Sequence, residues 1–351
     1  MRTQICVLVI SLSLCSVGYT QLPVGTEGKT DAPEEQLIGQ PSHMIAVDPN
    51  AKLGGVIRCI FEDSKGVLWI GGEGDLFRIE GKTVSIYDLK DDLGNGVTIK
   101  QIVEGRSGEI WCGTTGGITR IDGNTFTSYG EKDGLISRDV WSTATDTKGD
   151  VWVGTIAGVC RFDGNRFYRF SIPKSPPDLT RGVTSEWIVH CITVDRKGRV
   201  WFGTNGGAYI YDGDTLSNLS EADGLPNQVV NKILEDSAGN VWIGTSHGGI
   251  CCFDGSVFTN FTTDKVVDGN EIWCIHEDHS GNIWFSGKQF GAYKFDGKDF
   301  THFSREDGLE TPGLMSILED TSGRLWLGGV GGLFRYDGTA FTQVNAQGPW
   351  H

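Results

Sequence analysis

The sequence has little proline and is short of positive charge. Only ten of its 351 residues are proline, and 30 Lys and Arg stand against 45 Asp and Glu, which gives a formal net charge of −15. No run of Lys or Arg interrupts this acidic composition. We therefore exclude a nucleic-acid backbone and an anionic membrane surface as partners. Hydrophobic residues make up 38% of the chain and charged residues 21%, which is globular and excludes a disordered acidic tail.

Long hydrophobic runs are also missing, apart from one at the N-terminus. Arg2 precedes an apolar stretch at 5–17, and small residues at 16–18 stand where a signal peptidase would cut. The stretch is shorter than the ~20 residues of a membrane-spanning helix. We expect a signal peptide at 1–18 and an exported chain, secreted or periplasmic, with no transmembrane segment. Lipidation at Cys15 is the less favoured alternative, because Leu14 occupies a position where a lipobox has a small residue.

Seven cysteines remain after removal of this segment. An odd number at irregular spacing does not form a disulfide framework. Cys59, Cys191 and Cys274 share one position of the repeat described below, inside an expected strand. We interpret them as small buried hydrophobic residues. A disulfide between neighbours in an oxidising compartment is the alternative.

Glycine, by contrast, is abundant, and the sequence repeats. The 51 glycines are about twice the usual share of ~7%, which indicates many tight turns between short strands. Seven tryptophans recur at spacings of 42, 41, 49, 41, 42 and 42 residues, and they are Trp69, Trp111, Trp152, Trp201, Trp242, Trp284 and Trp326. Asp-Gly pairs recur in step with them, with Glu80-Gly81 as a variant. Such a period indicates a repeat architecture.

Each unit divides into four expected strands, exemplified by 56–61, 68–70, 118–121 and 125–129. Asp-Gly between alternating hydrophobic residues is a strong hairpin signal, and no segment keeps a 3.6-residue period. Seven four-stranded units of this length predict an all-β fold, a seven-bladed β-propeller of antiparallel blades. We assign residues 55–351 to the propeller and 19–54 to an N-terminal linker. Within that linker, residues 37–47 are a candidate closing strand for the last blade.

The repeat is similar to a known family. The segments at 235–248, 161–164 and 133–135 carry Glu-Asp-x-x-Gly-x-x-Trp-x-Gly-Thr-x-x-Gly, Arg-Phe-Asp-Gly and Asp-Gly-Leu, and this pattern resembles the two-component regulator propeller repeat. The resemblance implies an extracellular sensor region of the kind found in bacterial hybrid histidine kinases, which often recognise saccharides. Such sensors usually carry two propellers, a further β domain, a membrane span and a kinase. We expect only the recognition half of that activity here, without signalling through a kinase of its own.

One column of the repeat varies while the others stay uniform. Eleven residues before each blade tryptophan the chain has Arg58, Lys100, Trp141, His190, Asn231, Trp273 and Met315, whereas nine residues before it the column is nearly all isoleucine. A spacing of two predicts that both columns share a strand face, with the variable column near the channel mouth. Cations, indoles, an imidazole and an amide converging there suit a polar ligand with apolar faces, such as a sugar. The alternative is an ordinary wet channel.

Loops on the same face add further candidates. Asn205, His247 and Lys288 lie between the second and third expected strands of their blades, and Glu73 holds the same place in the first blade. The single long connection, 171–186, explains the 49-residue spacing. Long loops often carry function, so this one is a candidate lid or an edge for a protein partner, with tolerated drift as the alternative.

Signs of catalysis are weak. Neither a Gly-x-Ser-x-Gly elbow nor a mononucleotide-binding loop is present. His276 and His279 flank an acidic pair that recurs around the repeat, so we interpret the pair as turn chemistry and His276 as packed, not as a metal site. Streptogramin-lyase-like propellers are the enzyme alternative, with His190, His247 and Glu73 as candidate residues. We predict no catalytic residue, no metal and no cofactor.

The sequence thus predicts an exported, non-enzymatic, sensor-type propeller that binds a small polar ligand, with a saccharide favoured. The expected ligand-binding residues are Arg58, Lys100, Trp141, His190, Asn231, Trp273, Asn205, His247 and Lys288. The alternatives are a protein-interaction scaffold that uses loop 171–186 and, less favoured, the lyase-like enzyme.

Overall fold

The computed structural model describes residues 53–91, 93–262, 267, 270–287, 291–348 and 350. The expected signal peptide, the candidate closing strand and Lys288 lie outside these residues. None of the helices in the described ranges is long and apolar enough to pass through a bilayer.

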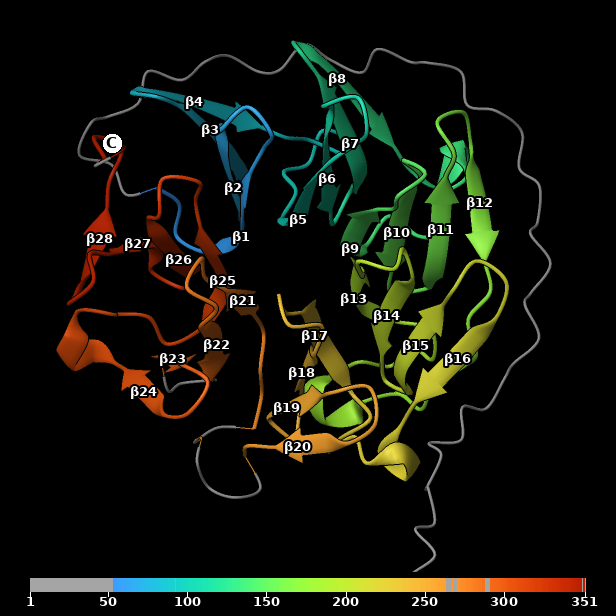
Figure 1. Ribbon diagram of the computed structural model, residues 1–351. Coiled ribbons are helices and arrows are strands. Elements are labelled where there is room, and N and C mark those ends of the chain that lie inside the picture. The colour runs from blue at the N-terminus through green and yellow to red at the C-terminus, as the bar shows by residue number, and fades with distance from the viewer. Residues whose placement is uncertain are drawn as a thin grey trace, which may run out of the picture.

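The described chain forms seven four-stranded antiparallel sheets arranged in a ring (Figure 1). The first three blades contain β1 (Ile57–Glu62), β2 (Leu68–Gly72), β3 (Asp75–Glu80) and β4 (Thr83–Asp88); β5 (Ile99–Glu104), β6 (Ile110–Thr114), β7 (Gly117–Asp122) and β8 (Thr125–Tyr129); and β9 (Val140–Thr145), β10 (Val151–Thr155), β11 (Gly158–Phe162) and β12 (Phe167–Phe170). The next two contain β13 (Val189–Val194), β14 (Val200–Thr204), β15 (Gly207–Tyr211) and β16 (Leu216–Leu219); and β17 (Val230–Glu235), β18 (Val241–Thr245), β19 (Ile250–Phe253) and β20 (Phe258–Asn260). The last two contain β21 (Ile275–Glu277), β22 (Ile283–Gly287), β23 (Gly291–Phe295) and β24 (Phe300–Phe303); and β25 (Leu314–Glu319), β26 (Leu325–Gly329), β27 (Gly332–Tyr336) and β28 (Phe341–Val344).

The predicted seven-bladed propeller is confirmed. Every sheet uses four strands that are consecutive in the chain, and the first strand of each blade lies nearest the ring axis (Figure 1). The expected strand at 125–129 coincides with β8, and the one at 56–61 is displaced from β1 by one residue at each end.

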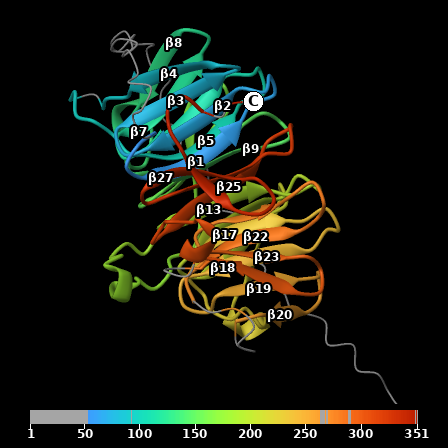
Figure 2. The same cartoon turned by 90° about the vertical axis from the view of Figure 1, so that its left-hand side faces the viewer.

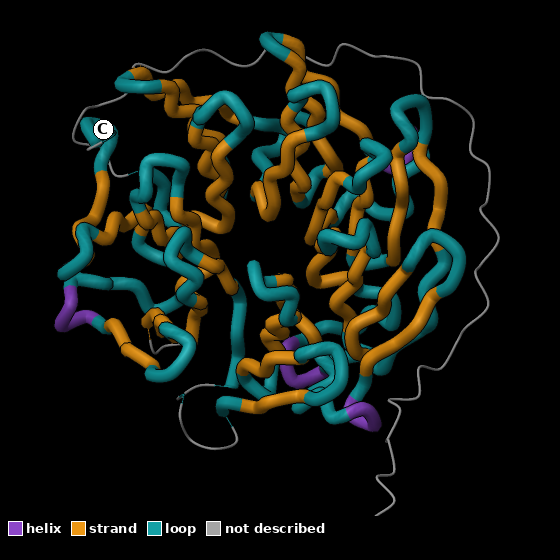
Figure 3. Tube along the Cα trace, in the orientation of Figure 1, coloured by secondary structure: helices purple, strands orange, loops and turns teal. Residues whose placement is uncertain are grey.

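Four short 3-10 helices interrupt the loops, seen as purple segments in Figure 3. They are η1 (Glu131–Asp133), η2 (Leu179–Arg181), η3 (Glu221–Asp223) and η4 (Arg305–Asp307). Three of them stand at Asp-Gly-Leu motifs, where the glycine that follows adopts a positive φ of 86–104° and ends the helix. Only η2 lies in the long connection after the third blade.

The acidic residue in the first turn of each blade holds that turn and the blade tryptophan together. In six blades an Asp carboxylate accepts a hydrogen bond from the indole Nε1 at 2.8–2.9 Å; the carboxylates belong to Asp63, Asp146, Asp195, Asp236, Asp278 and Asp320. The same carboxylates also accept backbone N–H groups of the turn, as Asp236 does from Ala238 and Asn240. In the second blade Gly105 takes this position, and Glu109 accepts from Trp111 instead.

The preceding glutamate links neighbouring blades. Glu104 of the second blade accepts from the backbone and hydroxyl of Ser64 in the first, and Glu277 accepts from Ser237 in the same way. The interpretation of the acidic pairs as turn chemistry is therefore confirmed, and it extends to contacts between blades. Because these carboxylates are already engaged by the fold, they are poor candidates for acid–base chemistry.

The ring closes through the same contacts, without a strand shared between its ends in the described residues. Thr321 of the last blade donates to Glu62 of the first from its N–H and its hydroxyl, at 2.7 and 2.9 Å. An isolated bridge joins Val56 to Val330. Trp350 stacks on Trp326, with ring centroids 5.8 Å apart, in a buried cluster drawn from the first and last blades.

The blade tryptophans lie in cores between adjacent blades. All seven are at most 5% exposed, and one cluster, for example, joins Trp201 of the fourth blade to Ile233 and Val241 of the fifth. The seven described cysteines are free thiols, and six of them are buried. Burial raises the pKa of Cys59 and Cys274 to about 12, in keeping with their interpretation as small apolar residues.

We predict that Asp236→Ala lowers the free energy of unfolding by about 2–3 kcal/mol, because it leaves the buried Trp242 indole and two turn N–H groups without their acceptor. Urea denaturation measures the loss. Asp254→Ala is the matched control: Asp254 also accepts two turn N–H groups but binds no indole and is exposed. Equal losses in the two variants would contradict a special role for the Asp–Trp pair.

Candidate functional site

A β-bulge marks the variable column. In β1, β5, β9, β13, β17 and β25 the pairing register to the second strand shifts at the residue eleven before the blade tryptophan. Bulges leave one residue unpaired and re-aim its side chain, and they recur next to functional sites. In the sixth blade, Trp273 lies just before β21.

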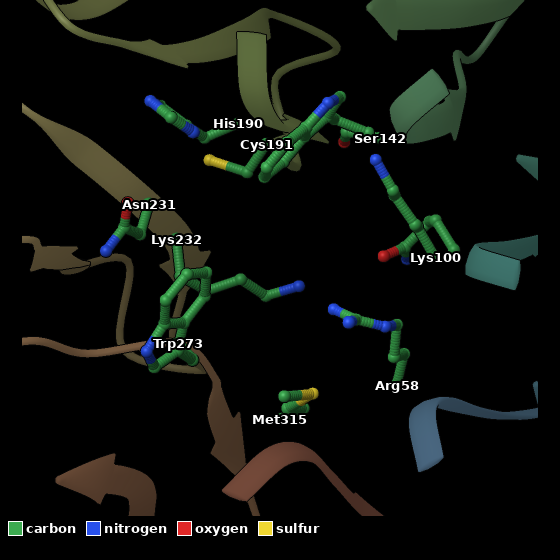
Figure 4. A pocket seen from close by; sticks show the side chains of 11 residues that line it. Arg58, Lys100, Ser142, His190, Cys191, Asn231, Lys232, Trp273 and Met315 are labelled. Carbon is green, nitrogen blue, oxygen red and sulfur yellow. The ribbon is translucent and has the colours of Figure 1, made fainter. Parts of the chain in front are cut away.

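The residues of this column line a single pocket at the channel (Figure 4). The structure brings together six of the nine expected residues, Arg58, Lys100, Trp141, His190, Asn231 and Trp273, with Met315 from the same column and with Gln101, Ser142, Cys191 and Lys232. The free space amounts to about 110 Å³. This volume is on the scale of a small ligand.

A break in the strand alternation accompanies this convergence. Ile57 and Ile60 pack in one cluster shared with the last blade, whereas Cys59 between them packs with the second blade. Since Ile57 and Ile60 are three residues apart and pack together, the bulge at Arg58 breaks the regular alternation of the inner strand. The inserted residue is turned to the channel by the bulge itself.

One side of the pocket is a chain of contacts around Trp141. The Lys100 Nζ lies 4.0 Å from the centroid of the indole and 2.5 Å from Asp139 Oδ1. Trp141 Nε1 donates to the other oxygen of Asp139 at 3.0 Å. The His190 ring meets the indole edge-on at 5.8 Å. Burial lowers the pKa of Lys100, although Asp139 acts against the shift.

Behind the pocket wall, Asn205 orients His190. His190 Nε2 donates to Asn205 Oδ1 at 2.7 Å, and Asn205 is fully buried with its Nδ2 unpaired among the described residues. Burial lowers the pKa of His190 to about 4, so the imidazole is neutral at pH 7. Asn205 thus supports the lining from behind and is not one of the residues that line the pocket.

The opposite side is covered by the connection 171–186, called the arm from here on. In Figure 2 the green arm stands out from one face of the ring. Its Arg181 donates to Asn231 Oδ1 at 3.0 Å and to Ser246 Oγ at 2.7 Å. The same guanidinium pairs with Glu271 at 3.3 Å and lies 4.6 Å from the Trp273 ring centroid. The arm therefore reaches from the third blade to the fifth and sixth.

His247 holds the arm and does not line the pocket. Its Nε2 lies 3.0 Å from Asp178 Oδ2 of the arm. Burial alone would raise the pKa of Asp178, but hydrogen bonds from Thr180 and His247 hold it below its ordinary value. Glu73 pairs with Arg58 at 3.1 Å, so it borders the pocket through that side chain.

The sequence reasoning missed Lys232. Lys232 lies ten residues before its tryptophan, in a column that otherwise has Cys or Ser except for Gln101. Lys232 could have been detected from the sequence, because a long cation replaces a small side chain in this nearly uniform inner column. The role of Arg181 required the path of the arm, which the sequence does not give.

Comparisons with known proteins agree with the propeller fold. The two component regulator propeller family matches at residues 52–74, 182–206, 224–247 and 267–289. Among solved structures, the extracellular domain described as the hybrid two component system BT3049 from B. thetaiotaomicron is 21% identical, with a TM-score of 0.63 over 80% of this chain and 39% of that one. A virginiamycin B lyase from Staphylococcus aureus, solved with quinupristin, is 14% identical, with a TM-score of 0.64; the match covers 81% of this chain and 96% of the lyase. PorZ, a surface component of the type-IX secretion system of Porphyromonas gingivalis, is 16% identical, with a TM-score of 0.63; the match covers 84% of this chain and 48% of PorZ.

At these identities the structural likeness establishes the fold alone. The chain spans well under half of the BT3049 domain and about half of PorZ. A search of curated proteins found no significant match. The molecule is a seven-bladed propeller with one pocket lined from all seven blades. Four of its segments match the two component regulator propeller family, as the sequence motifs indicated.

We predict that His190 makes the protein less stable in mild acid. Its pKa lies near 4 in the folded chain and near ~6.5 in the unfolded chain, so the unfolded state takes up the proton first. Stability therefore falls as the pH drops from about 6.5 to 4, by at most about 3 kcal/mol from this residue. His190→Gln should flatten the fall in urea unfolding between pH 7 and 4.5, whereas His279→Gln, at an exposed turn, should not. Parallel slopes for wild type and His190→Gln would refute the prediction.

Proposed function

We propose that this chain is a non-enzymatic, sensor-type propeller that binds a small polar ligand at the mouth of its channel, with saccharides as the first class to test. The observation that carries the proposal is the contrast between columns. The turn aspartates, the blade tryptophans and the glycine loops repeat around the ring, while the variable column has six residue types in seven blades and lines one pocket. Variation confined to a pocket supports recognition, because the scaffold does not require it.

The chemistry of the lining supports a polar ligand. Asn231 and the three cations offer hydrogen-bond donors, the neutral His190 offers an acceptor, and the indoles of Trp141 and Trp273 offer apolar surface. Both indoles already have a cation over the ring, Lys100 and Arg181 respectively. A sugar ring would therefore stack on the remaining indole face or displace the cation. Small polar ligands are commonly bound where a few placed polar groups converge on apolar walls.

A role in sensing is carried over from the family. Its description names two-component regulation, and BT3049 is described as an extracellular domain of such a system. Export of this chain rests on the apolar segment at 5–17. We propose the recognition step here, with the read-out of the bound state assigned to another protein or domain.

The engagement of the candidate acid–base groups supports the non-enzymatic part of the proposal. Glu73 is paired with Arg58, His190 is neutral and bound to Asn205, and His247 is bound to the arm. No hydrogen bond or ion pair within the described part of the chain joins any two of these three groups. The virginiamycin B lyase is a structural neighbour, but a shared fold carries no activity by itself.

The arm is also the basis for the second candidate, a protein-interaction scaffold. Trp187, just beyond the arm, is 39% exposed and has the Lys174 amine 4.5 Å from its ring centroid. A partner that binds the arm would meet this exposed indole. Because Arg181 contacts two residues that line the pocket, Asn231 and Trp273, we give priority to the ligand-binding function.

We predict that Trp141→Ala/Trp273→Ala abolishes the ligand-induced rise in melting temperature. A thermal-shift screen of the mature chain against saccharides, small metabolites and divalent metals identifies the ligand. At ~100 times its Kd a ligand adds about 2.7 kcal/mol of stability, which corresponds to several degrees. The double variant should lower the melting temperature of the free protein by a few degrees at most, since both indoles are half-buried.

Trp187→Ala is the matched control, because it removes an indole outside the pocket. It should keep the full ligand-induced shift. Equal shifts in wild type and the double variant would refute the assigned site. A shift seen with a divalent metal alone, together with turnover of a substrate, would favour the enzyme alternative.

A further inference from the structure

Three cations line the pocket, and no carboxylate lines it. Arg58, Lys100 and Lys232 belong to its wall, whereas none of the lining residues is Asp or Glu. This is unexpected in a chain of formal net charge −15. The local charge of the site is therefore opposite in sign to that of the protein.

Two of these cations are paired and one is not. Arg58 contacts Glu73 and Lys100 contacts Asp139, both carboxylates outside the lining set. The Lys232 side chain makes no hydrogen bond or ion pair with any residue that the structure describes. The Nε of Arg58 is likewise buried without a partner in that part of the chain. The pocket thus contains one positive charge without a counter-charge, on Lys232, and one buried donor without an acceptor, Arg58 Nε.

The fold does not use Lys232. At the equivalent position of other blades, a small side chain binds the inner strand of the next blade. Ser142 Oγ accepts from Ile192 N at 2.6 Å, Ser316 Oγ accepts from Ile60 N at 3.0 Å, and Cys59 Sγ lies 3.9 Å from Ile99 O. Lys232 makes no such contact. A lysine at this position lacks the interblade hydrogen bond, and no other hydrogen bond or ion pair of its side chain within the described residues replaces it.

The Lys232 side chain reaches across the channel. Figure 4 shows its amine directed from the fifth blade into the pocket, toward the side where Arg58 lies. Burial raises the pKa of the Cys59 and Cys274 thiols, and in both cases the charge of Lys232 acts against that rise. Since Cys59 stands in the first blade and Cys274 in the sixth, the charge of Lys232 acts across the channel.

Unpaired cations crowded in a partly buried site repel one another and are poorly hydrated. A bound anion would relieve both penalties. A dianion such as phosphate would overcompensate the single uncompensated charge, whereas a monoanion matches it. A carboxylate also suits an arginine edge and an ammonium group, because its two oxygens accept from both.

We infer that the pocket selects a small organic monoanion, with the ligand's carboxylate held between Lys232 and Arg58 and its neutral part against His190, Asn231 and the indoles. The inference rests on the proposed function and names its ligand class. An acidic sugar satisfies both, since it joins hydroxyl groups to one carboxylate. Binding involves no covalent step.

The test uses ligand pairs that differ only in the charged group. Glucuronate is compared with glucose and galacturonate with galactose, by calorimetry and thermal shift at constant ionic strength, with acetate and inorganic phosphate as simple anions. We expect at least one of the carboxylates to bind and raise the melting temperature by a few degrees near saturation, with the neutral partner at least tenfold weaker. Phosphate should bind more weakly than the best carboxylate.

The Lys232→Met variant supplies the second test. It should weaken carboxylate binding by about 10–100-fold while leaving the melting temperature of the free protein equal or higher, because a repelling charge is removed. Lys298→Gln is the control, since that side chain is 87% exposed in an outer turn; it should change neither property. A lower melting temperature for Lys232→Met would show a structural role and overturn the inference.

The remaining outcomes separate this inference from the proposed function. If no carboxylate binds, the inference is overturned. If neutral sugars bind equally well, lose binding in Trp273→Ala and keep it in Lys232→Met, the inference fails while the channel-mouth function stands. If phosphate binds more tightly than every carboxylate, the monoanion assignment is wrong.

Discussion

The hydrogen bond from each blade tryptophan to a turn aspartate is the interaction on which the ring depends. The carboxylate fixes the hairpin that joins the first two strands and at the same time satisfies a buried indole N–H. The neighbouring glutamate then bonds to the adjacent blade. One dipeptide thus sets a turn, a core side chain and an interblade contact. Because the Glu-Asp pair has all three roles, it recurs in most blades. In the second blade, where Gly105 replaces the aspartate, Glu109 accepts from the indole instead.

Because the turns and the interblade cores specify the scaffold, the residue at the start of each inner strand can vary. In six of the seven blades a bulge places one unpaired residue toward the axis, where it neither pairs with the second strand nor belongs to an interblade core. Substitution there costs the fold little, so side chains as different as Arg58, Trp141 and Met315 are tolerated. Under the proposed function, the repeat provides stability and one column around the axis provides recognition.

Most of the fold was predictable from the sequence, because each signal is local. Trp spacing, Asp-Gly hairpins and strand alternation fix blade number and strand order without knowledge of distant contacts. The site was predictable only in part. Six column residues were found by their variability, but the bulge that aims them was not, since a one-residue insertion leaves no mark in a repeat that carries it in nearly every blade. The position of Arg181 depends on the path of the arm, which local pattern does not encode. His247 was placed in the pocket by loop position, whereas its bond to Asp178 assigns it to the arm.

The arm and the pocket are not independent parts. Arg181 bonds to Asn231 and covers Trp273, and both of these line the pocket. Its own charge is compensated by Glu271 of the sixth blade, so the arm is tied to the far side of the ring by an ion pair and a stacked ring. A ligand that approaches Asn231 or the Trp273 face must either accept Arg181 as a further contact or displace it. Since a ligand shifts a conformational equilibrium only by its differential affinity for the two states, the contacts of Arg181 determine whether occupancy of the channel changes the outer face of the propeller, where a partner would detect it.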